Sequence, residues 1–244
     1  MNAPAVYLIW YGNWNQSNGS DNAAGQQIIR DLLYGMNGSP YYATNASYTG
    51  VSGKFSVAKE TTDNYSQGFR LSDRGVANVV SNAINSSRLI KDSNGIYFVL
   101  SSSDVAETSG FCSQYCGWHT YGFLGGTNIK YAFVGNANRC LNSCAIQSVG
   151  PNGNAGVDGM ASVVAHELEE ANTDPNLNAW YDANGWEDAD KCAWTFGSNL
   201  SQTANGAYYN MTLPTSTGGN RPFMIQRELD ANSLCYVNYV TKAQ

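Results

Sequence analysis

Six cysteines in a chain of 244 residues constrain its folding more than any other feature of the sequence. Four of them form two C-x3-C pairs, Cys112 with Cys116 and Cys140 with Cys144, which leaves Cys192 and Cys235. An even set of cysteines is typical of a disulfide framework, so we expect all six to be oxidised. We interpret the spacing as two local bridges and one long-range bridge, although other connectivities and a zinc-ribbon site remain open.

The cysteines and the surface composition both indicate an extracellular protein. Disulfides persist mainly in oxidising, extracellular compartments. Only 13% of the residues are charged, and Asn, Ser, Thr, Gly and Tyr take their place. The first residues lack the basic start and cleavage site of a signal peptide, so we expect a secretory signal to lie outside this sequence. N-x-[ST] sequons, which become glycosylated on secreted chains, occur at Asn15, Asn18, Asn37, Asn45, Asn64, Asn85, Asn199 and Asn210.

The charge pattern excludes two classes of partner. The net charge is -6, and lysines and arginines form no cluster of the density that nucleic acid or an anionic membrane requires. No apolar run approaches the roughly 18 residues that span a bilayer. We therefore expect neither nucleic-acid nor membrane binding.

The order of apolar patterns predicts an α/β fold. Residues 5–11, 96–100 and 130–134 form β-rich apolar runs that indicate buried strands, and residues 48–57 indicate short strands or a hairpin. Helical spacing predicts a helix over residues 23–34 with Asp21 as its cap, and another that starts at the Ser72 cap. A third helix is expected over residues 157–172.

The chain is expected to form a single domain of residues 1–244 with two unequal parts. Residues 1–172 form the sheet-and-helix part, and residues 173–244 form a loop-rich C-terminal part with a last strand near residues 234–240. No internal repeat or low-complexity linker separates the two parts.

The third helix carries the strongest chemical signal, the HELEE motif of residues 166–170. Its apolar residues Val157, Val164 and Leu168 fall on one stripe, whereas His166 and Glu170, one turn apart, fall on the opposite side. In zinc peptidases, H-E-x-x-H places two ligands at i and i+4, with the intervening Glu as general base. Here Glu170 takes the second ligand position and Glu167 the general-base position. The alternative is an acidic, solvated helix face.

Further metal ligands are expected from the acidic stretch that follows this helix. Such a density of like charge is costly unless a cation neutralises it. Glu187 is the favoured third ligand, with Asp190 and Asp174 as alternatives, while an Asn/Asp-rich turn or a calcium site are the competing interpretations. The carboxylates of this stretch are Asp174, Asp182, Glu187, Asp188 and Asp190.

The second histidine, His119, follows Cys116 in CGWHTYG and is read as part of a disulfide-anchored loop. Such a loop is a rigid mount for a further zinc ligand, although a histidine beside Trp118 also fits a packed residue. Other catalytic classes have weaker signals, because the chain has no G-x-S-x-G elbow and no phosphate-binding loop after a strand.

Several segments, in order along the chain, carry a family resemblance: VYLIWYGNW, IYFVLSSSDV, FCSQYCGWH, YAFVGNANRC and GPNGNAGVDGM. With these segments the chain resembles the EXORDIUM-like, phosphate-induced protein 1 family, which is extracellular and associated with plant cell-wall growth. It is similar to microbial relatives in AHELEEANTDP and WYDANGWEDADKC, a pattern that falls on His166, Glu167, Glu170, Asp174, Glu187 and Asp190. The element order also looks like the upper subdomain of zincin-type metalloproteases, with an active-site helix under a mixed sheet.

These observations predict a secreted, zincin-like α/β domain with zinc-hydrolase chemistry. His166, Glu170 and a loop carboxylate would hold Zn²⁺, and Glu167 would be the general base in hydrolysis, with a peptide or protein as the expected substrate. The alternative is a module without enzymatic activity that binds cell-wall polysaccharide through its 16 Tyr and 6 Trp and holds structural Ca²⁺.

Overall fold

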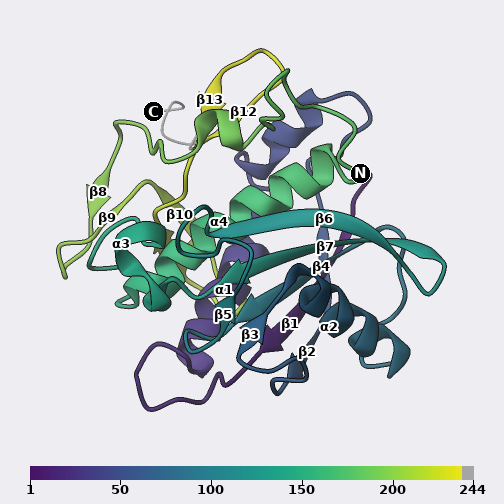
Figure 1. Ribbon diagram of the computed structural model, residues 1–244. Helices are drawn as coiled ribbons and strands as arrows, with labels where there is room; N and C mark the ends of the chain where they lie inside the picture. The colour runs from purple at the N-terminus through teal and green to yellow at the C-terminus, as the bar shows by residue number, and fades with distance from the viewer. Residues whose placement is uncertain (238–244) are drawn as a thin grey trace.

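A five-stranded mixed sheet forms the centre of the computed structural model, which describes residues 1–237 (Figure 1). Its strand order is β2-β1-β4-β7-β6, and the strands predicted over residues 5–11, 96–100 and 130–134 are confirmed. The mixed α/β class is thus confirmed. The strands are β1 (Ala5–Tyr11), β2 (Ser56–Asp63), β4 (Gly95–Ser101), β6 (Gly117–Leu124) and β7 (Thr127–Gly135).

Burial of the central strands fits the mainly parallel arrangement of the sheet. β1, β2, β4 and β7 run parallel, and the central strands AVYLIWY and GIYFVLS are apolar runs that are buried on both faces. β6 alone runs antiparallel, paired with β7 at one edge. The prediction of a loop around His119 is wrong, because this residue lies within β6, opposite Ala132.

Three long helices cover the two faces of the sheet: α1 (Ala23–Met36), α2 (Asp73–Asn85) and α4 (Ala155–Thr173). α1 and α4 share one apolar core with the sheet, and α2 packs on the other face (Figure 1). Ser72 caps α2 as predicted. Asp21 does not cap α1, because the Asn22 side chain accepts from Gly25 N instead, while Asp21 accepts from Ser103 N.

Helix α4 is buried on almost all sides rather than on one stripe. Val157, Val164 and Leu168 pack into the core as predicted. The polar side is covered as well, since the carboxylates of Glu167, Glu169 and Glu170 are all buried. The C-terminal part of the chain supplies much of this cover, so the side chains of the HELEE motif lie in enclosed surroundings.

The C-terminal part consists of short elements, as the loop-rich prediction required. Its β10–β11 hairpin packs Met211, Leu213 and Phe223 into the same core as α1 and α4. The predicted last strand is confirmed only at Cys235–Tyr236, and residues 238–240 of that prediction lie outside the described residues. The elements are η3 (Asp190–Cys192), β8 (Ser201–Gln202), β9 (Tyr208–Tyr209), β10 (Met211–Pro214), β11 (Asn220–Phe223), β12 (Glu228–Leu229) and β13 (Cys235–Tyr236).

The prediction of strands or a hairpin over residues 48–57 is wrong except at its end, where β2 begins at Ser56. A 3-10 helix, η1 (Tyr42–Ser47), precedes this segment, and irregular backbone joins the two. Two glycines, Gly50 and Gly53, interrupt any regular pattern here. The remaining elements are β3 (Arg70–Leu71), β5 (Ala106–Glu107), η2 (Ala137–Arg139) and α3 (Leu141–Cys144).

The disulfides confirm one predicted bridge and correct the other two. Cys192 pairs with Cys235, but the C-x3-C pairs are not local bridges, since the structure joins Cys112–Cys140 and Cys116–Cys144. The short helical turn over residues 140–144 places its two cysteines on one side, as i and i+4 positions require. Both therefore face the loop of residues 112–116, and each sulfur meets a sulfur of the other segment.

Two of the eight sequons are buried, which excludes a glycan there in the folded chain. Asn45 is fully buried and Asn210 nearly so, and both side-chain amides are hydrogen-bonded within the protein. The other six asparagines are exposed. Among residues 1–237, no helix is long and apolar enough to cross a membrane.

Candidate metal centre

Two histidines and several carboxylates meet where α4 faces β6 and the loop before η3. The ligand atoms of His166, Glu170 and Asp190 lie within 4.8 Å of one another, and so do those of His119, Glu167 and Glu170. Glu170 belongs to both groups. The helix therefore contributes the HELEE side chains, β6 contributes His119, and η3 contributes its first residue, Asp190.

His166 and Glu170 lie on the same side of α4, as the i, i+4 spacing predicts. His166 Nε2 is 3.0 Å from Glu170 Oε1 and 3.6 Å from Asp190 Oδ1. Asp190 also anchors its loop to the helix, because its backbone N–H donates to Glu170 Oε1 at 3.0 Å. One glutamate thus contacts both the histidine and the loop that approaches it.

His119 approaches the same carboxylate from the sheet. His119 Nε2 is 3.7 Å from Glu170 Oε2 and 2.7 Å from Glu187 Oε2. Its other ring nitrogen, Nδ1, is buried without a hydrogen-bond partner among the described residues, as is Glu187 Oε1. Buried polar atoms without a partner are costly, and a bound cation relieves that cost when it rearranges the ligands around it.

The sequence-predicted ligands separate into three groups. Asp190 approaches His166, whereas Glu187, the favoured third ligand, contacts His119 instead. Asp174 is buried, but its carboxylate accepts from the backbone N–H groups of Asn178 and Ala179 and joins neither ligand group. Asp174 therefore stabilises the turn that follows α4.

The carboxylates raise the proton affinity of both histidines. Burial lowers the pKa of His119, but the hydrogen bond to Glu187 and the charge of Glu170 outweigh it and raise the pKa to about 9. Burial opposes the charged form of His166 in the same way, yet Glu170 and Asp190 hold its pKa well above the usual value. Since a histidine ligates as neutral imidazole, cation binding at this centre competes with protonation.

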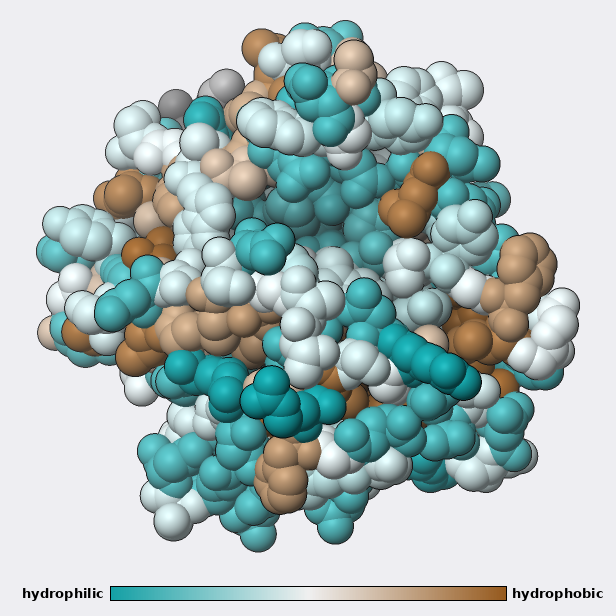
Figure 2. Space-filling model, in the orientation of Figure 1, coloured by the Kyte–Doolittle hydropathy of each residue, from teal (hydrophilic) through white to brown (hydrophobic). Residues whose placement is uncertain are grey.

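Glu167 differs from the ligand pair in its position on the helix. It lies about 100° around the helix from His166 and lines a cavity of about 310 Å³ together with His166, Asp190, Trp194 and Gln226. Burial raises the pKa of its carboxyl to about 8, and the histidines act in the opposite direction. A carboxyl of this kind exchanges protons near neutral pH. Figure 2 shows a hollow with a hydrophilic lining on one face of the molecule.

The roles of two residues of this centre were not predicted from the sequence. The side-chain amide of Gln226 contacts His166 Nδ1, and its Oε1 accepts from Trp194 N at 3.1 Å, which fixes the ring. Gly117 lets β6 approach α4, because a Cβ there would lie 2.6 Å from Val163 Cγ1 and 3.0 Å from Glu167 Oε1. Gly117 stands two residues before His119, so its closeness to a candidate ligand offered a local signal in the sequence. Gln226 lies sixty residues beyond His166 and offered none.

The donor set fits zinc. Imidazole nitrogens and carboxylate oxygens together suit Zn²⁺, whereas Ca²⁺ and Mg²⁺ prefer oxygen alone. The partner that Gln226 provides to the far ring nitrogen is the kind of contact that orients histidine ligands in metal sites. His166, Glu170 and Asp190 are the residues that would hold the ion.

Comparison with known proteins places the chain in a family. Residues 2–220 match the model described as the phosphate-induced protein 1 conserved region. Protein EXORDIUM-like 5 and Protein EXORDIUM-like 3 of Arabidopsis thaliana are each 31% identical over 91% of this chain, covering 70% and 75% of their own lengths. Protein PHOSPHATE-INDUCED 1 of Nicotiana tabacum is 27% identical over 84% of the chain and 76% of its own length. No solved structure matches. The chain therefore belongs to the phosphate-induced protein 1 family.

Proposed function

We propose that this protein is a zinc-dependent hydrolase with a peptide bond as its target. One observation carries the proposal: His166, Glu170 and Asp190 converge, and His166 and Asp190 line a polar cavity together with Glu167. An HE-x-x-E helix packed under a mixed sheet with an antiparallel edge strand also fits the zincin-like arrangement expected from the sequence.

The ligand set we propose places Asp190 where the sequence favoured Glu187. Asp190 Oδ1 lies 3.6 Å from His166 Nε2, whereas Glu187 Oε2 is hydrogen-bonded to His119 at 2.7 Å. Glu187 then orients His119, and His119 completes the ligand set or donates a hydrogen bond to the bound substrate. Zn²⁺ at this position would supply a Lewis acid that polarises a carbonyl group and acidifies water.

Glu167 has the role of proton carrier. Its carboxyl lines the cavity and belongs to the group formed with His119 and Glu170, yet it lies to one side of the His166–Glu170 pair. It takes a proton from water as the attack on the substrate carbonyl begins and returns it to the leaving amine. Gly117 leaves room for this carboxyl between α4 and β6.

Metal content tests the proposal most directly. Elemental analysis of the purified full chain should find zinc near one equivalent, and His166→Ala should remove it. Asp182→Asn is the matched control, since Asp182 pairs with Lys191 in the same acidic stretch and contacts none of the proposed ligands. Wild-type protein without zinc, or a His166→Ala variant with full zinc content, would refute the proposed centre.

The three disulfides support a proposal about where the protein is located. We place the protein outside the cell, because structural disulfides persist in oxidising compartments and are rare in the cytosol. Six exposed sequons are compatible with that setting. Mapping of glycans on protein from a eukaryotic secretory host should find none at Asn45 or Asn210.

A second candidate function has one observation in its favour. The C-terminal part exposes the large aromatic side chains of Trp180, Tyr181, Trp186 and Trp194. Exposed aromatic rings stack on sugars, so the alternative is a wall-polysaccharide-binding module without hydrolysis. Sedimentation with insoluble polysaccharide separates the two functions. This alternative predicts binding that Trp186→Ala weakens and that zinc removal leaves unchanged.

A further inference from the structure

Glu170 belongs to two groups of possible metal ligands, and the proposed zinc centre uses only one of them. That group is His166, Glu170 and Asp190. The other is His119, Glu167 and Glu170, whose ligand atoms also lie within 4.8 Å of one another. The two groups contain different histidines, and the chain has only two. Each group therefore offers one imidazole nitrogen and two carboxylates, with Glu170 in common.

The two oxygens of Glu170 lie nearest to different histidines. Glu170 Oε1 is 3.0 Å from His166 Nε2, and Glu170 Oε2 is 3.7 Å from His119 Nε2. Carboxylates on helices can serve both ions of a two-metal site, where the ions lie about 3.5–4 Å apart. One glutamate of α4 thus presents an oxygen to each group.

The separation of His119 Nε2 and Glu170 Oε2 suits two ligands of one ion better than a direct contact. At 3.7 Å it is longer than a hydrogen bond. Zinc bonds to nitrogen and oxygen of about 2.0–2.2 Å place two ligand atoms of a tetrahedral site about 3.4 Å apart. A small adjustment of the two side chains would therefore let both atoms bind the same zinc ion.

Glu167 provides an independent observation, because its buried carboxylate lacks a hydrogen-bond donor. The residue is 4% exposed, and among residues 1–237 its carboxylate accepts no hydrogen bond. Buried carboxylates in native proteins are normally hydrogen-bonded or paired with a cation. Glu167 also lines the cavity of about 310 Å³, so an ion from solvent can reach the group at this residue.

We propose that His119, Glu167 and Glu170 form a second zinc site, weaker than the first, and that an ion bound there inhibits hydrolysis. The inhibition rests on the proposed function, in which Glu167 is the general base. Zinc is favoured over calcium because one of the donors is an imidazole nitrogen. A zinc ion on the Glu167 carboxylate occupies the oxygens that would take a proton from water, so hydrolysis stops while the ion is bound.

Two features make the second site weaker than the first. His119 Nε2 is 2.7 Å from Glu187 Oε2, and this contact must break before the nitrogen binds an ion. Loss of a hydrogen bond to a charged group costs roughly 10–100-fold in affinity. Repulsion between two zinc ions that share Glu170 acts in the same direction. Zinc would therefore fill the His166 group first and the His119 group at higher concentration.

Zinc binding by the full chain tests the proposal. Protein freed of metal with a chelator should bind two equivalents of zinc in equilibrium dialysis, the second at least about tenfold more weakly. His119→Ala and Glu167→Gln should each keep the tight equivalent and lose the weak one, whereas His166→Ala should do the reverse. Glu60→Gln is the matched control, since this glutamate pairs with Arg30 outside both groups, and it should keep both equivalents. Far-ultraviolet circular dichroism confirms that each variant is folded.

Cobalt(II) in place of zinc shows whether the two ions are neighbours. Two cobalt ions that share Glu170 should couple magnetically across the short distance of a two-metal site. The electron paramagnetic resonance intensity per cobalt should then fall as the second equivalent binds. Intensity that simply doubles would place the second ion elsewhere and overturn the proposal.

The outcomes separate this inference from the proposed function. A single tight equivalent, with no second one up to about a thousandfold above its Kd, would overturn the second site and leave the hydrolase centre intact. Zinc that binds only in the weak mode lost in His119→Ala would overturn the hydrolase centre and leave this site. Once a substrate is found, excess zinc should inhibit the wild type as the weak equivalent binds. The same inhibition in His119→Ala would overturn the inhibitory role.

Discussion

Helix α4 carries two successive glutamates into two clusters of different chemistry. Glu170 meets His166, His119 and Asp190, a set that offers nitrogen and oxygen donors. Glu169 lies in the cluster that contains Asp188 and Glu228, and it accepts from Asn45 Nδ2. Successive helical residues point about 100° apart, so one position along the chain changes the surroundings completely. Donor type, rather than acidity, distinguishes the two clusters.

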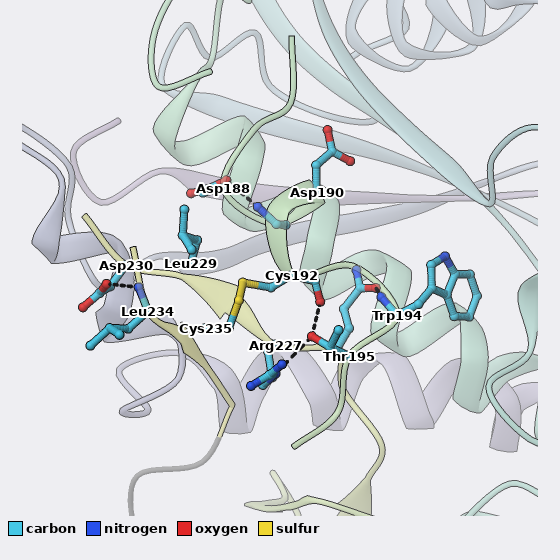
Figure 3. Close-up of a disulfide and its surroundings, with 12 residues drawn as sticks. Asp188, Asp190, Cys192, Trp194, Thr195, Arg227, Leu229, Asp230, Leu234 and Cys235 are labelled. Carbon is cyan, nitrogen blue, oxygen red and sulfur yellow. Dashed lines mark hydrogen bonds between the residues drawn. A yellow bond between two sulfur atoms is a disulfide. The ribbon is translucent and has the colours of Figure 1, made fainter. Parts of the chain in front are cut away.

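The segment at the start of η3 contributes a carboxylate to each cluster. Asp188, in the loop before η3, points to the carboxyl cluster, and Asp190, the first residue of η3, points to the histidine centre. Figure 3 shows their carboxyl groups directed away from each other. The Cys192–Cys235 disulfide follows directly and joins η3 to β13.

The largest expected effect separates Glu167 from the ligands of the histidine centre. Glu167→Gln should keep zinc but lower hydrolysis by at least about a hundredfold, because glutamine has similar size and cannot accept the proton. Glu170→Gln should lose zinc instead. Casein and short peptides provide the first screen, with zinc content measured in parallel. Near wild-type turnover by zinc-loaded Glu167→Gln would refute the general-base role.

Removal of the Cys192–Cys235 disulfide should affect the histidine centre, because Cys192 lies two residues after Asp190 in η3. Replacement of both cysteines by alanine should cost about 3–4 kcal/mol of unfolding free energy in the chain-entropy model, measured by denaturant unfolding. Zinc affinity should fall as well. Unchanged zinc affinity in the folded double variant would contradict the dependence of Asp190 on this bridge.

Gln226→Leu should sharpen the contrast by acting on one cluster only. Loss of the amide beside His166 Nδ1 should weaken zinc binding by roughly 10–100-fold. Competition with a chromophoric chelator measures the zinc affinity. Wild-type zinc affinity in a folded Gln226→Leu variant would contradict the role of this amide.

Asp174→Asn should have the smallest effect on zinc binding. Asp174 accepts hydrogen bonds from Asn178 N and Ala179 N, and asparagine retains an acceptor oxygen for this turn. The zinc content should equal that of the wild type in elemental analysis. If zinc is lost in a folded variant, Asp174 belongs among the ligands after all.

Local patterns were sufficient for much of this fold. Apolar runs predicted β1, β4 and β7, and helical spacing predicted α1, α2 and α4, because burial repeats with the period of each element. The same rule predicted that His166 and Glu170 share one side of α4. Weak patterns failed, as they did for the irregular segment before Ser56 and for β6, where Gly117 and Gly122 interrupt the strand signal.

The sequence by itself determined the main strands and helices and the position of the HELEE motif on its helix. Only the tertiary structure decided which cysteines pair, that His119 lies on a strand, and that Asp190 rather than the favoured Glu187 approaches His166. It also brought Glu228 to Glu169, fifty-nine positions away. Helical and strand periodicity acts over a few residues, whereas the packing of the C-terminal part against α4 depends on side-chain contacts from the whole chain.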